Sequence, residues 1–90
     1  MTDPIETRIQ HVLESGDQVS FDNALSDGYA RALRLDSERL ELERRITELA
    51  ARAEDHETAQ QLRRAWLRHR TVSRELRELR ALLRRLKAQT

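Results

Sequence analysis

The sequence predicts an all-α protein in which a short N-terminal helix is followed by a long, antiparallel, coiled-coil-like helical hairpin. Apolar residues recur at intervals of three and four through most of the chain, which is the spacing of one face of a helix. Two glycines, one proline and three aromatic residues among 90 supply little of the material from which turns and strands are built. One small helical domain spanning residues 1–90 accounts for this length.

The charge of the chain is divided between its two parts. Residues 1–55 contain seven arginines and thirteen acidic residues, for a net charge of −6. Residues 56–90 contain nine arginines and one lysine but three acidic residues, for a net charge of +7. An acidic helix followed by a basic helix is the pattern expected when two helices lie against each other. The excess of arginine over lysine has two explanations that the sequence leaves open: the codon usage of a GC-rich genome, or a preference for guanidinium groups.

The first helix is expected at about residues 4–15. Asp3 can cap it, and Pro4 suits its first position. Gly16 is a natural end, and residues 16–20 are predicted to form a linker. A helix this short is marginal on its own, so its apolar face must pack against another part of the chain. That face consists of Ile5, Ile9, Val12 and Leu13.

The first arm of the hairpin is expected at about residues 21–53, with Ser20 or Asp22 as its cap. Two series of residues with a spacing of seven define its inner face. The first series is Phe21, Gly28, Leu35, Leu42 and Leu49, and the second is Leu25, Ala32, Arg39, Ile46 and Ala53. Gly28 follows two polar residues and is a weak point, at which the helix could begin instead.

The second arm is expected at about residues 56–88, and its inner face also consists of two series. They are Leu62, His69, Leu76 and Leu83, and Thr58, Ala65, Val72, Leu79 and Leu86. These series are one residue out of phase with those of the first arm, which favours a reversal of the chain near residues 53–56. One continuous helix with a local phase slip is the alternative.

The sequence offers no catalytic, metal or cofactor site. It has no cysteine, and the zinc-protease pattern that begins at His56 lacks its second histidine because Gln60 stands there. His69 lies on the inner face of the second arm, where we expect it to form a hydrogen bond that sets the register. No phosphate-binding loop or Ser/His/Asp set is present. No apolar run is long enough to span a membrane and no signal peptide follows Met1, so we expect a non-enzymatic protein of the bacterial cytoplasm.

Arginines line one flank of the second arm. We call Arg63, Arg70, Arg74, Arg77 and Arg84 the arginine ladder, because four of them follow one another at intervals of seven and Arg74 lies on the same flank. Residues spaced by seven are about 10.5 Å apart along a helix. Guanidinium groups bind phosphate oxygens in pairs, so the ladder predicts a surface for nucleic acid or a nucleotide. The alternative is a solvated face, or one that pairs with the acidic arm through Glu38, Glu41, Glu43 and Glu48.

Several large apolar side chains lie outside the inner faces of the two arms. They are Leu33, Leu40, Trp66, Leu67 and Leu82. A two-helix hairpin cannot cover all of them, and the first helix can cover only part. We therefore expect these residues to bind a second copy of the chain, as in a dimeric helical bundle, or a helix of another protein. Trp66 is the expected centre, because aromatic residues often dominate the binding energy of an interface.

The expected outline is similar to that of two families that act in transcription, the actinobacterial cyclic-di-GMP-dependent anti-sigma factors and the Gre-type transcript-cleavage factors. Asp22 and Ser26 begin a spacing like that of the first family's signature, but Tyr29 stands where that signature has arginine. Acidic residues between 54 and 57 would lie at the hairpin tip, as in the second family, whose surrounding motif and second domain are missing. The likeness is one of architecture. The expected function is that of a small interaction or regulatory protein, with phosphate binding as the alternative.

Overall fold

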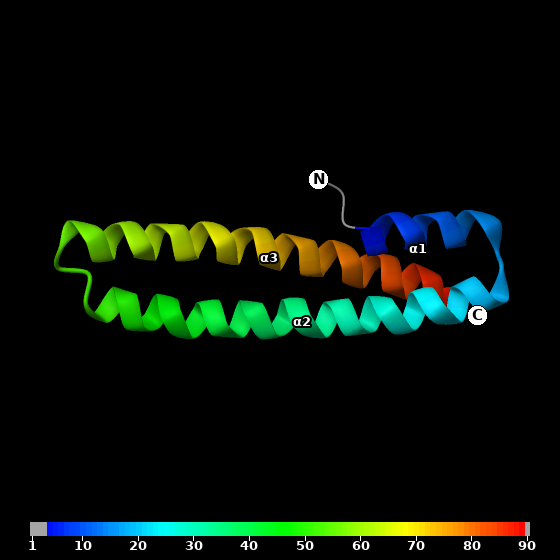
Figure 1. Ribbon diagram of the computed structural model, residues 1–90, viewed down its shortest axis with the longest axis horizontal. Helices are drawn as coiled ribbons and strands as arrows, with labels where there is room; N and C mark the ends of the chain where they lie inside the picture. The colour runs from blue at the N-terminus through cyan, green and yellow to red at the C-terminus, as the bar shows by residue number, and fades with distance from the viewer. Residues whose placement is uncertain (1–3, 90) are drawn as a thin grey trace.

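The computed structural model describes residues 4–89, which form three α-helices joined by short turns (Figure 1). They are α1 (Pro4–Ser15), α2 (Gln18–Ala51) and α3 (His56–Ala88). The two long helices run antiparallel as the arms of a hairpin, and α1 folds back beside its open end (Figure 1). The predicted all-α hairpin is therefore confirmed, and the alternative of one continuous helix is wrong. The molecule is a rod with extents of 55 × 21 × 15 Å.

The connection between α1 and α2 is shorter than the sequence suggested. Gly16 has a φ of +73°, the left-handed conformation that commonly ends a helix, and its N–H donates to the Val12 carbonyl at 2.9 Å. Asp17 then caps α2, because its carboxylate accepts the hydroxyl of Ser20 at 2.6 Å and the backbone N–H of the same residue at 3.4 Å. The expected cap, Ser20 or Asp22, is thus wrong, and the linker is two residues long. The other expected cap, Asp3, lies outside the described residues.

The hairpin turns over four residues, 52–55, without glycine or proline. Arg52 closes α2 with a backbone hydrogen bond to the Leu49 carbonyl. Asp55 opens α3, because its carboxylate accepts the backbone N–H of Thr58 at 2.7 Å. An extended cap residue that satisfies a free N–H of the first turn is what allows the chain to stop one helix and begin the next.

Replacing Asp55 with alanine should lower the melting temperature by several degrees at neutral pH, because a first-turn N–H loses its acceptor. The Thr58 N–H, which donates to this carboxylate, holds the pKa of Asp55 below its usual value. A depressed pKa stabilises the fold above the unfolded pKa, near 4, and this contribution is lost as pH falls through the folded value. The difference between wild type and Asp55→Ala should therefore shrink in acid, as followed by circular dichroism. Asp55→Asn keeps an acceptor oxygen and serves as the control; a difference unchanged by acid would argue against the cap.

The apolar core lies between the two arms and under α1. The main cluster consists of Ile9, Val12, Phe21, Ala24, Ala32, Leu35, Val72, Leu76, Leu79, Leu83 and Leu86. A smaller cluster near the turn consists of Ile46, Leu49 and Ala65. Leu42 packs against both clusters, whereas the inner-face residues Arg39 of α2 and His69 of α3 are polar.

Gly28 marks the place where all three helices meet. A Cβ atom at this position would lie 2.5 Å from Leu83 Cδ2 and 3.3 Å from Ile9 Cδ1. The absence of a side chain therefore lets α1 and α3 approach α2 closely. The sequence marked Gly28 as a weak point of the helix, but α2 runs through it without a break.

Candidate functional site

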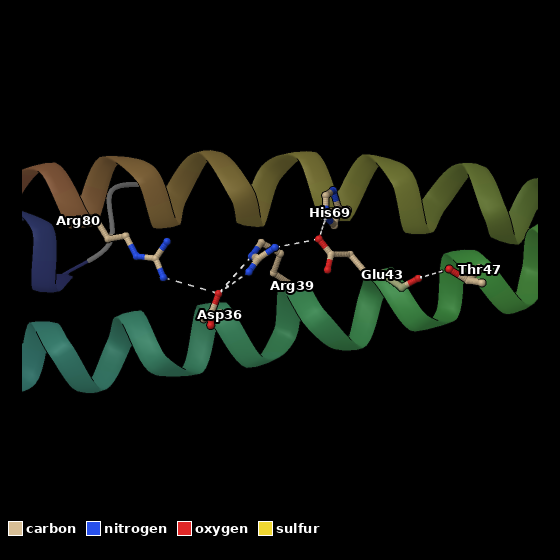
Figure 2. Close-up of polar contacts among 6 residues, drawn as sticks. All are labelled: Asp36, Arg39, Glu43, Thr47, His69 and Arg80. Carbon is tan, nitrogen blue, oxygen red and sulfur yellow. Dashed lines mark hydrogen bonds and ion pairs between the residues drawn. The ribbon is translucent and has the colours of Figure 1, made fainter.

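One face of the hairpin carries a row of side chains from each long helix, and we call these two rows the walls of a groove. The α2 wall consists of Tyr29, Leu33, Asp36, Leu40, Glu43 and Thr47, and the α3 wall consists of Trp66, Arg70, Ser73, Arg77, Arg80, Arg84 and Lys87. Successive members of each wall are three or four residues apart, which places them on one side of their helix. One contact joins the walls, since Arg80 Nη2 lies 3.7 Å from Asp36 Oδ1 (Figure 2). A second ties the α2 wall to the inner face of α3, where Nε2 of His69 lies 3.2 Å from Glu43 Oε1.

Near the open end of the hairpin, side chains of both walls border an open hollow of about 470 Å³. Its lining combines an apolar floor with a cationic rim: Tyr29, Ala32, Leu33 and Asp36 from α2, and Arg80, Leu83, Arg84 and Lys87 from α3. Apolar area beside fixed charges is the usual make-up of a binding surface, because the first gives affinity and the second gives orientation.

The acidic groups of the α2 wall already have cationic partners. Arg39 donates to Asp36 Oδ1 and to Glu43 Oε1, each at 2.8 Å, and so bridges the two carboxylates (Figure 2). The hydrogen bond to Asp36 raises the pKa of the Arg39 guanidinium, which like that of any arginine is charged at every accessible pH. His69, which the sequence predicted to form a hydrogen bond on the inner face, forms one with the Glu43 carboxylate. The carboxylates of this wall are therefore compensated within the molecule.

The arginines of the ladder have no such partners. All five are exposed, and among residues 4–89 none of their side chains forms a hydrogen bond or ion pair. The acidic arm pairs elsewhere: Glu38 accepts from Arg68 at 2.7 Å, and Glu41 accepts from Arg44 of its own helix at 2.8 Å. The expected pairing of the ladder with the acidic arm is therefore not seen in the described part of the chain.

The apolar residues predicted to bind a partner divide into three groups. Leu33, Leu40 and Trp66 lie on the groove walls and are 70%, 46% and 54% exposed. Leu67 is also exposed, but it lies about 100° further round α3 than Trp66, outside the groove. Leu82 packs against the main core and is only partly exposed, so it contributes to folding more than to an outer surface.

Among the large exposed apolar residues of the groove, sequence reasoning missed Tyr29. Tyr29 is 45% exposed and lines the open hollow beside Leu33. The signal was present, because Tyr29 precedes Leu33 by four residues and so shares its side of the helix. At the other end of the groove, the ring of Trp66 meets His69 edge to face, with centroids 5.8 Å apart.

Other kinds of site have little support in the described residues. Within residues 4–89, no group of three or more His, Cys, Asp or Glu side chains is placed to hold a metal ion. None of the helices described is both long and apolar enough to cross a membrane. The chain matches no protein-family model, no curated protein and no solved structure. The groove is therefore the feature from which a function can be argued.

Proposed function

We propose that this is a non-enzymatic helical interaction protein, which binds a helix of a second copy or of another protein in the groove. The exposure of Leu33, Leu40 and Trp66 on one face carries the proposal. Large apolar side chains gathered on one face of a small protein usually mark an interface. A third helix commonly docks on such a surface through apolar side chains spaced by three and four residues.

The surface area of the molecule supports the same proposal. The accessible surface is 6574 Å², whereas a compact monomer of 10.6 kDa is expected to expose about 5,500 Å². The difference of about 1,000 Å² is close to the roughly 800 Å² that each partner contributes to a standard interface. The isolated hairpin thus exposes more surface than a compact protein of the same mass, by about the area that each partner contributes to one interface.

Self-association through the groove is the first test. Sedimentation over a wide concentration range should show a dimer or a larger assembly. A Leu33→Ser/Leu40→Ser variant should shift the equilibrium toward monomer by at least about tenfold, because two buried leucines are lost from the interface. Leu67→Ser is the control, since Leu67 is 55% exposed but lies outside the groove. A folded monomer at tens of micromolar would contradict self-association.

Phosphate binding by the arginine ladder is the second candidate. It is favoured by one observation, the absence of acidic partners for the five ladder side chains within residues 4–89. The ladder spans about 30 Å of helix, so several phosphates of a nucleic acid could be neutralised together, or one nucleotide could be held by two adjacent rungs. Binding of this kind should weaken steeply with salt, whereas an apolar interface should not.

A further inference from the structure

The hairpin already binds one short amphipathic helix, its own α1. The Ile9 side chain of α1 is fully buried, packed near Gly28 and Leu83. Arg8 of α1 forms an ion pair with Asp27 of α2 at the edge of this contact. The contact thus combines an apolar stripe in the cleft with a charge pair at its rim. It shows the chemistry by which a further helix can dock on this hairpin.

The groove lies on the other side of the hairpin from α1. Asp27, which contacts α1, and Tyr29, which lines the groove, are two residues apart and so about 200° apart around α2. The α1 helix therefore leaves the groove uncovered. Its open walls extend from Tyr29 to Thr47 on α2, which is about 27 Å and long enough for five turns of a docked helix.

We infer that the groove binds an acidic amphipathic helix of a partner protein. This inference rests on the proposed function and names the chemistry of the partner. The apolar stripe of that helix would face Tyr29, Leu33, Leu40 and Trp66. Its acidic flank would lie over the α3 wall, where Arg70, Arg77 and Arg84 are exposed and have no acidic partner in the described chain.

Charge decides between this occupant and a second copy of the chain. The α2 wall needs no cation from outside, because Arg39, Arg80 and His69 already bind its carboxylates. On the α3 wall, Arg70, Arg77 and Arg84 have no acidic partner in the described chain, and a second copy cannot readily supply one. Its α3 carries ten basic and three acidic residues, a net charge of +7, and its α2 carries seven acidic and five basic residues, a net charge of −2. A second copy can cover the apolar walls, but an acidic helix also neutralises the arginines.

A designed peptide tests the inference directly. The probe is a 21-residue helix without tryptophan, with leucines spaced alternately by three and four residues and glutamates on the flanks. A matched peptide carries lysine in place of each glutamate, and a third carries a central proline that breaks the helix. Trp66 is the protein's one tryptophan and lies on the groove wall, so its emission should shift to the blue when a helix excludes water from it. Calorimetry gives the affinities.

The glutamate peptide should bind at least about tenfold more tightly than the lysine peptide, and salt should reduce the difference. Arg77→Gln/Arg84→Gln should weaken its binding by about threefold to tenfold, through loss of two rim charges. The control is Arg64→Gln/Arg85→Gln, which removes the same charge from exposed positions outside the groove wall. Leu33→Ser should also weaken binding, and the proline peptide should not bind.

Four results would overturn the inference. Equal affinities for the glutamate and lysine peptides would contradict the charge argument. Equal losses of peptide affinity in the two double arginine variants would show that the peptide does not bind at the groove. Binding of a 20-base-pair DNA duplex that depends on Arg77 and Arg84 but not on Leu33 would assign the ladder to nucleic acid instead. Sedimentation without peptide is an independent measurement. A dimer that ignores the glutamate peptide would therefore refute the acidic partner and leave the proposed function standing.

Discussion

Leu35→Ala should destabilise the protein by about 2–5 kcal/mol, because it leaves a cavity at the centre of the main core. The Leu35 side chain is 1% exposed and belongs to the cluster that joins α1, α2 and α3. The core of a small domain without cysteines is expected to supply about 3–5 kcal/mol of stability. We therefore expect most of the Leu35→Ala protein to be unfolded at 37 °C, as measured by urea denaturation followed by circular dichroism.

Leu33→Ala is the matched control for this prediction, since Leu33 lies two residues away on the same helix and is 70% exposed. At concentrations where the protein is monomeric, its effect should be within about 0.5 kcal/mol, as for most surface substitutions. The concentration matters because association stabilises the folded chain. Similar losses in the two variants would mean that α2 is rotated relative to the structure, with Leu33 on the inner face.

The hairpin could be predicted because apolar residues recur at a spacing of seven over most of its inner faces, despite polar exceptions such as Arg39 and His69. Leu35, Leu76, Leu79, Leu83 and Leu86 all belong to the series with a spacing of seven, and all are buried. A regular repeat of this kind specifies which side of each helix is covered, whatever lies beyond it. The complementary charge of the arms and the change of phase near the turn then favoured a reversal over a continuous helix.

The start of α2 and the role of Gly28 could not be predicted in the same way. Asp17, Ser20 and Asp22 are all good caps, and local sequence does not choose among them. In the structure Asp17 accepts two hydrogen bonds from Ser20, so the helix begins three residues early. Gly28 matters through Leu83 and Ile9, which are distant in sequence. A contact among three helices cannot be predicted from the residue pattern of one helix.

The components of the groove were predicted, but their arrangement was not. The sequence indicated an apolar surface containing Leu33 and, separately, a ladder containing Arg84. The structure places both at the same hollow. Their meeting depends on the rotation of α2 relative to α3, which the Asp36–Arg80 contact reports and no local pattern encodes. The position of Leu82 on its helix suggested that this side chain is exposed. In the structure it packs against the core instead and so has a structural role.

Trp66→Ala should weaken self-association by at least about 2 kcal/mol, the loss expected when a central aromatic residue is removed from an interface. Trp66 is 54% exposed in the single chain, so most of its burial is still to be gained on association. Replacing Arg63, Arg70, Arg77 and Arg84 with glutamine should change the association free energy little and act mainly on rate and orientation. Sedimentation velocity gives both values, and circular dichroism checks that each variant is folded.

If phosphate binding is the main function, the glutamine variant should be impaired more than Trp66→Ala. Titrated with a DNA duplex at low salt, the glutamine variant should then lose most of its affinity, because each neutralised phosphate contributes through counterion release. Trp66→Ala should leave that affinity almost unchanged, since no second aromatic residue lies on the α3 wall to stack with bases. Trp66→Phe separates aromatic packing from any specific role of the indole, and it should retain most of the self-association. Small and equal effects of the alanine and glutamine variants in both assays would show that neither the groove nor the ladder is the binding surface.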